Sequence, residues 1–170
     1  MMEGMITELL MDGLMAAIAA TGFAIISNPP RKAIYLSAVL AAIGHALRYF
    51  LVNHASTDIV TATVISSFTI GMITIFFAKL IHCPPEVFSF PSLLPMIPGM
   101  YAYRTFLSLM HFIQAKDPST MQAVMVDILH NGALTVSILF ALVLGVSLPL
   151  FIFHRQSFLM TRIMHNRHRA

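Results

Sequence analysis

Long apolar segments dominate this sequence and leave few folds open to it. Five of them follow one another with only short loops between them, at about residues 9–26, 33–52, 59–80, 87–112 and 121–149. A membrane-spanning helix needs about 20 predominantly apolar residues, so each segment is long enough to cross a bilayer. We therefore expect an all-α integral membrane bundle of about five transmembrane helices.

The composition excludes a water-soluble enzyme. Only 10% of the 170 residues are charged and 58% are hydrophobic, whereas a soluble domain has about a quarter of its residues charged. No nucleophile elbow, HExxH motif or phosphate-binding loop is present, and Cys83 is the only cysteine. We expect no catalytic activity, no cofactor and no metal site. The basic residues gather at span ends and in the tail, which favours a membrane protein over a nucleic-acid partner.

The distribution of basic residues predicts the topology. Cytoplasmic loops of membrane proteins carry the excess of Lys and Arg. With five spans, one side of the membrane receives seven basic residues and the other receives only Lys116. We expect a multi-pass protein of the cell (inner) membrane, N-terminus outside and C-terminus in the cytoplasm. Residues 1–153 would form the transmembrane domain, with a retained first span, and residues 154–170 a basic cytoplasmic tail that meets anionic lipid.

The fourth segment contains FPSLLPMIPGMYAYRTF (residues 90–106), with three prolines, a glycine and an arginine. Proline removes a backbone donor, and backbone freed in this way has to be buried in protein or line a wet cavity. We expect this helix to break at Pro98 and Gly99, with a half-helix beginning near Gly99. Its free N–H groups, together with Arg104 one to two turns further on, would hold a substrate carboxylate. The alternative is a kink that serves packing alone.

The second segment contains AAIGHALRYF, which places His45 and Arg48 on one helix face. Ser37, Ala41 and Gly44 form a stripe of small residues that allows another helix to approach closely. Two interpretations of the charged pair are open. His45 and Arg48 would assist substrate binding, or Arg48 extends to the lipid headgroups while His45 is a hydrogen-bonded packing residue.

Further ionisable groups lie in the first and fifth segments. Asp127 and Asn131 share a face of the fifth segment, His130 lies beside that face, and Asp12 lies near the outer end of the first segment. These groups would couple protons to transport, since a carboxyl group among apolar helices makes a proton carrier. Alternatively, they neutralise the two intramembrane arginines in a structural ion-pair network.

Three stretches together resemble the small subunit of the threonine/serine exporter family: GFAIISNPPRKAI, AAIGHALRYFL and VFSFPSLLPMIPGMYAYRTFLSL. The similarity extends from about Gly22 to Pro149, and the proline-broken PSLLPMIPGMYAY is its most specific part. In that family the exporter is either one chain with about ten spans or two chains. The resemblance implies that this chain corresponds to the C-terminal half and has a larger multi-span subunit as its partner.

The resemblance also implies a function. The chain would be a subunit of a proton-coupled secondary transporter that exports small carboxylate-bearing metabolites, either threonine and serine or a short dicarboxylate such as succinate. Two intramembrane arginines favour a dicarboxylate. Two other functions stay open, a non-transporting assembly subunit and a passive channel for small organic anions. A homo-oligomer that transports without a partner is a further possibility.

Overall fold

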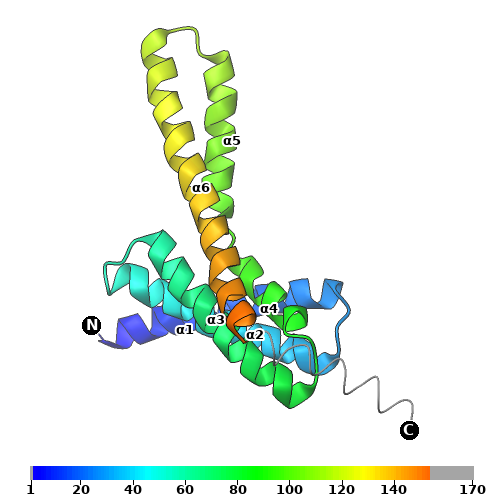
Figure 1. Ribbon diagram of the computed structural model, residues 1–170. Coiled ribbons are helices and arrows are strands. Elements are labelled where there is room, and N and C mark those ends of the chain that lie inside the picture. Colours follow the sequence, from blue (N-terminus) through cyan, green and yellow to red (C-terminus); the bar gives the residue numbers. More distant parts are fainter. Residues whose placement is uncertain (1, 154–170) are drawn as a thin grey trace.

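The computed structural model of the chain describes residues 2–153, which form helices joined by short loops (Figure 1). In chain order these are α1 (Met2–Ile26), α2 (Arg31–Asn53), α3 (Ile59–Ile81), α4 (Glu86–Leu93), the 3-10 helix η1 (Leu94–Met96), α5 (Gly99–Gln114) and α6 (Pro118–Ile152). No strand occurs among these residues. The expected all-α class is therefore confirmed.

Four helices of the described part are long and apolar enough to cross a membrane: residues Gly4–Ile26 of α1, and the whole of α2, α3 and α6. The predicted fourth span, residues 87–112, is not among them, because it is divided into helices of 8, 3 and 16 residues. The chain is thus a helical membrane protein with one broken apolar segment. The predicted boundary between a transmembrane domain (residues 1–153) and a cytoplasmic tail (residues 154–170) stays a prediction, since the tail lies outside the described residues.

Polar residues mark the end of α1 and the start of α6. α1 ends at Ile26, just before Asn28, whose positive φ of 48° turns the chain toward two prolines. Asp117 caps the first turn of α6 by accepting hydrogen bonds from the amides of Ser119 and Thr120. Hydrogen bonds from Thr120 and Ser119 lower the pKa of the Asp117 carboxyl to about 2. The cap is therefore ionised at neutral pH.

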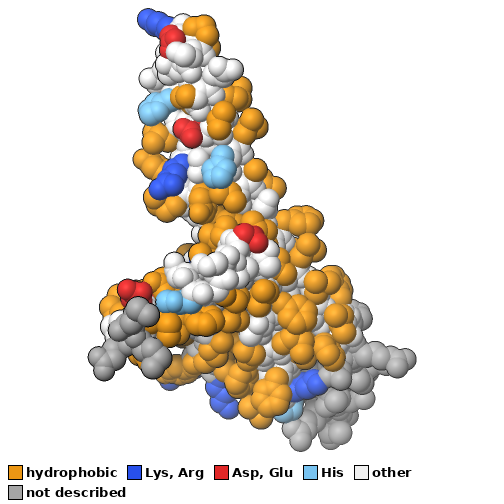
Figure 2. Space-filling view, turned by 90° about the vertical axis from the view of Figure 1, so that its left-hand side faces the viewer, with side chains coloured by type: hydrophobic (Ala, Val, Ile, Leu, Met, Phe, Trp, Pro, Cys, Tyr) orange, Lys and Arg blue, Asp and Glu red, His pale blue; other side chains and the backbone are white. Residues whose placement is uncertain are grey.

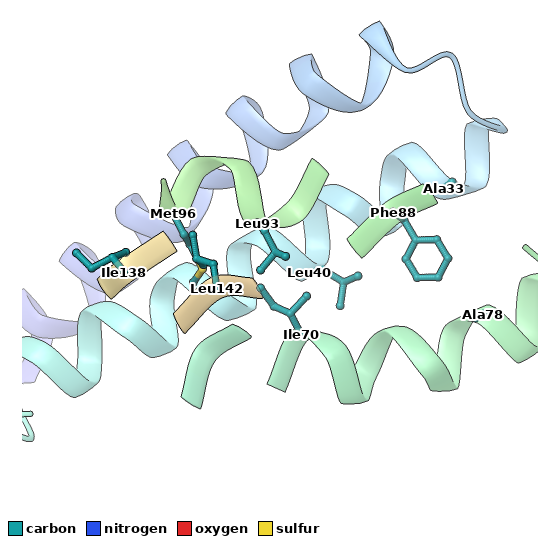
Figure 3. Packing of buried hydrophobic residues seen from close by; sticks show 9 residues of the cluster. All are labelled: Ala33, Leu40, Ile70, Ala78, Phe88, Leu93, Met96, Ile138 and Leu142. Atoms are coloured by element: carbon teal, nitrogen blue, oxygen red, sulfur yellow. The ribbon is translucent and has the colours of Figure 1, made fainter. Parts of the chain in front are cut away.

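The core of the bundle forms around the first half of the broken segment. Buried apolar residues of α2, α3, α4, η1 and α6 make one cluster (Figure 3): Ala33, Leu40, Ile70, Ala78, Phe88, Leu93, Met96, Ile138 and Leu142. Phe88 and Met96 are almost completely removed from solvent. Burial of these side chains holds α4 and η1 inside the bundle.

The stripe of small residues predicted on the second segment is confirmed. Ser37, Ala41 and Gly44 are all buried in α2. A Cβ atom at Gly44 would lie 2.4 Å from the side chain of Ile70 on α3 and 3.4 Å from that of Met96 on η1. The absence of a side chain at Gly44 therefore allows α2, α3 and the broken segment to meet closely.

A hairpin made of α5 and the first part of α6 projects from the bundle (Figure 1). We call this hairpin, residues 99–137, the arm. α5 packs mainly against α6 and has no buried residue, and Asn131 is the single buried residue of the arm. α6 joins the core only from Ile138 onward, where its side chains contact those of the bundle. The break at Pro98 is the point at which the chain leaves the bundle.

Candidate functional site

A row of hydrogen-bonded side chains connects α1, α2 and the break. Nδ1 of His45 lies 2.5 Å from Oδ2 of Asp12, and Nε2 of His45 lies 3.0 Å from Nη2 of Arg48. Nη1 of Arg48 donates to the main-chain carbonyl of Met96 at 2.8 Å. We call Asp12, His45 and Arg48 the triad. The triad thus ends on the backbone of the broken segment.

The hydrogen bonds determine which ring nitrogen of a neutral His45 carries the proton. A guanidinium group has only donors, so Nε2 of His45 has to accept from Arg48. The ring proton is then on Nδ1, which donates to the carboxylate of Asp12. In this state a neutral imidazole separates one negative from one positive charge, and the triad as a whole is neutral.

Close packing of α1 against α2 brings Asp12 within reach of His45. A Cβ atom at the neighbouring Gly13 would lie only 3.2 Å from the carbonyl oxygen of Ala42, so a side chain there would hold the helices apart. One turn away, the hydroxyl of Tyr49 donates to Glu8 at 2.9 Å. The two helices are therefore joined by polar contacts on two successive turns.

The break presents unpaired backbone groups beside the triad. η1 ends at Met96, and the amide of Gly99 donates to the carbonyl of Ile97 at 2.8 Å. No side chain caps the first turn of α5 within the described residues. Around Gly99 no heavy atom beyond its own helix and chain neighbours lies within 4 Å of the position that a Cβ would take. The N-terminus of α5 therefore has open space beside Gly99. The amides of Gly99 and Ala102 are paired, so the donors left in this turn for an anion are those of Met100 and Tyr101.

The structure divides the residues singled out from the sequence into two groups. Asp12, His45 and Arg48 meet at the break. Arg104, Asp127 and His130 lie on the arm with exposed side chains. Within residues 2–153 no hydrogen bond or ion pair joins the three arm residues to the triad or to one another through their side chains.

Asn131 belongs to the packing of the arm. Its side chain is buried, and its amide donates to the carbonyl of Asp127 in the preceding turn at 2.9 Å. The main-chain carbonyl of Asn131 accepts a hydrogen bond from the hydroxyl of Thr135 at 2.8 Å. The side-chain amide and the main-chain carbonyl of Asn131 are thus both hydrogen-bonded within α6.

Two members of the site were missed in the sequence. The main-chain carbonyl of Met96 accepts a hydrogen bond from Arg48. Such an acceptor could be anticipated in general terms, because a helix break leaves carbonyls unpaired on its N-terminal side. The carboxylate of Glu8 accepts a hydrogen bond from the hydroxyl of Tyr49. Glu8 could be anticipated from the sequence because it lies one turn before Asp12 on the same face of α1. Among the described residues, no group of three or more His, Cys, Asp or Glu side chains could hold a metal ion.

The helices and the site define a polytopic membrane protein with a polar triad at a helix break. The family model of the threonine/serine exporter, ThrE, matches residues 12–152, and the chain belongs to this family. The chain is also 36% identical over 149 residues to an uncharacterised protein of Haemophilus influenzae, covering 88% of this chain and 49% of that relative. It therefore spans about half the length of this curated relative. No solved structure matches the chain.

Proposed function

We propose that this chain is one half of a proton-coupled secondary transporter that exports small carboxylate-bearing metabolites. The observation that carries the proposal is the hydrogen bond of Arg48 to the freed carbonyl of Met96, because it places a fixed positive charge against a helix break. Arginine matches the geometry of a carboxylate, and discontinuous helices hold anionic substrates in other secondary transporters. Membership of an exporter family supports the transport role.

The substrate carboxylate would compete with the Met96 carbonyl for Arg48. A carboxylate is the stronger acceptor, since charge-assisted hydrogen bonds are roughly twice as strong as neutral ones. The amides of Met100 and Tyr101, which follow Gly99 in the first turn of α5, would donate to the remaining oxygen, and Pro98 would act as the hinge. Loss of the hydrogen bond between Arg48 and the Met96 carbonyl would then allow the arm to move relative to the bundle. Arg104 follows on the same half-helix, and a short dicarboxylate such as succinate has a second carboxylate for it.

Proton coupling would act through Asp12 and His45. Protonation of His45 turns Nε2 into a donor facing the donors of Arg48, so the hydrogen bond between them is lost. The groups that face this pair are Asp12 from α1 and Tyr101 from α5, both of which interact electrostatically with Arg48. Proton binding would thus loosen Arg48 from the break. Asp127 and His130 on the arm are the alternative proton carriers, and Asp127→Asn tests them.

Replacement of His45 by glutamine is expected to leave some transport but to remove its dependence on pH, because histidine can bind a proton at this position and glutamine cannot. Glutamine offers one donor and one acceptor, so it partly preserves the contacts to Asp12 and Arg48 without binding a proton. The control is His54→Gln, at the exposed end of the same helix. Flux against pH decides: an unchanged pH profile in His45→Gln would exclude the histidine from coupling.

The arrangement in the membrane follows from the charge bias. In the cell membrane, the N-terminus would lie outside and the C-terminus in the cytoplasm. The complementary half would be a larger multi-span subunit. Support for a second half comes from the Haemophilus influenzae relative, of which this chain covers 49%.

Flux across reconstituted vesicles tests the function. The chain, purified with whatever multi-span partner accompanies it from its native membrane, is reconstituted and given labelled threonine, serine or succinate with and without a pH gradient. We expect at least one of these substrates to accumulate only when the gradient is present. Flux that is indifferent to the gradient would instead identify a passive channel. Equal flux by the partner alone and by the complex would identify this chain as a non-transporting assembly subunit.

A further inference from the structure

The arm carries ionisable side chains on an otherwise apolar surface (Figure 2). α5 exposes large apolar side chains along its length, among them Phe106, Leu107 and Met110. Arg104 and His111 share one face of α5, and Asp127 and His130 share one face of α6. The surface of the arm is therefore mostly apolar, as in a membrane helix, but it also carries ionisable groups that lipid does not solvate.

Lipid alone cannot cover such a surface. A charged side chain at the centre of a membrane helix costs about 2.5–3.5 kcal/mol on insertion scales, and such residues face protein or a water-filled cavity. Within residues 2–153 no ion pair compensates Arg104 or Asp127. The groups that satisfy them have to come from outside the described residues. The base of the arm lies at the break, so whatever covers the arm also lies next to the candidate site.

The length of the relative indicates what covers the arm. In the Haemophilus influenzae protein, a stretch about as long as this chain remains beyond the matched part, on the same polypeptide. We take this unmatched stretch as the second half of the transporter, which the same polypeptide keeps close to the matched half. Among residues 2–153, the arm is the longest stretch with almost no buried residue: α5 has none, and the part of α6 in the arm has only Asn131.

We propose that the arm is the docking surface for the complementary half of the transporter, and that Arg104, Asp127 and His130 are buried in that interface. This inference rests on the proposed function, because it takes the complementary half to exist. The interface encloses the break, so the triad and the partner together would line the substrate path. A charge pair between Asp127 and a basic group of the complementary half would fix the register of the two halves.

Site-specific photo-crosslinking in the native membrane tests the surface. The photoreactive amino acid p-benzoylphenylalanine replaces Leu107 on the arm, on the same face as Arg104, or Ile65 on α3 as the matched control. Both side chains are 41% exposed, so neither replacement disturbs the core. We expect the Leu107 position to give several-fold more adduct than Ile65. The crosslinked peptides should align with the part of the Haemophilus influenzae relative that lies outside the match.

Three results would overturn the inference. An adduct that contains only peptides of this chain, at twice its mass, would show that a second copy covers the arm. Adducts to lipid alone would show that the arm is not covered by protein. Equal adducts of the complementary half at both positions would show that the arm is not the docking surface. Flux measured in the same membranes separates this inference from the proposed function, because a complementary half crosslinked at Leu107 without flux refutes only transport.

Discussion

Replacement of Arg48 by alanine is expected to abolish most of the transport. The guanidinium bonds both His45 and the Met96 carbonyl, and alanine leaves the carbonyl, the imidazole and the charge of Asp12 without their partner. In the proposed cycle Arg48 pairs with the substrate carboxylate, and truncating one partner of such a desolvated charge pair costs about 2–5 kcal/mol, which corresponds to roughly 30-fold or more in affinity. The measurement is substrate binding and flux in vesicles that contain the purified complex.

Two further variants separate loss of the site from loss of the fold. Arg48→Lys retains the charge but not the planar fork that reaches two acceptors, so we expect weakened transport rather than none. Arg31→Ala removes an exposed arginine from the first turn of the same helix and should transport normally. Each variant is first checked for assembly with its partner and for a monodisperse elution profile. Normal affinity and rate in an assembled Arg48→Ala variant would refute the proposed role of Arg48.

The position of the break could be predicted from the sequence because proline acts locally. Pro98 has no N–H to donate, and α5 begins at Gly99 as expected. The shared face of His45 and Arg48 was predictable for a similar reason, since helical periodicity is a local property. The all-α membrane class follows from the lengths of the apolar segments. These features depend on a few neighbouring residues, and a single sequence contains them in full.

The grouping of the charges could not be predicted, because it depends on which helix faces meet. Asp12 joins His45 through the close approach of α1 at Gly13, a contact between residues far apart in the sequence. Arg104 appeared equivalent to Arg48 in the sequence, yet the chain leaves the bundle between Met96 and Arg104. In a helix that is apolar on every side, periodicity does not distinguish a face turned to lipid from one turned to a partner.

Replacement of Gly145 by alanine is expected to destabilise the contact that attaches the arm to the bundle. At this crossing of α3 and α6, Oγ of Ser67 lies 2.7 Å from the carbonyl oxygen of Thr63 in its own helix and 3.1 Å from that of Ala141 in α6, so one hydroxyl proton is shared between acceptors on both helices. A Cβ atom at Gly145 would lie 1.8 Å from Oγ of Ser67 and 2.9 Å from the carbonyl oxygen of Val64. The hydroxyl can rotate away, but the Val64 carbonyl is backbone, so the helices have to separate. Overpacking of this kind costs about 1–3 kcal/mol.

Helix propensity acts in the opposite direction, and the control variant measures it. Alanine is favoured over glycine by about 0.8–1.0 kcal/mol in a helix interior. Gly22→Ala in α1 should gain this amount without a clash, because no atom lies within 4 Å of its Cβ position. Thermal stability in mild detergent should therefore fall for Gly145→Ala and hold or rise for Gly22→Ala. Adding Ser67→Ala to Gly145→Ala should restore only part of the loss, because the contact with Val64 remains. Equal stability of the two single glycine variants would mean that α3 and α6 do not cross this closely.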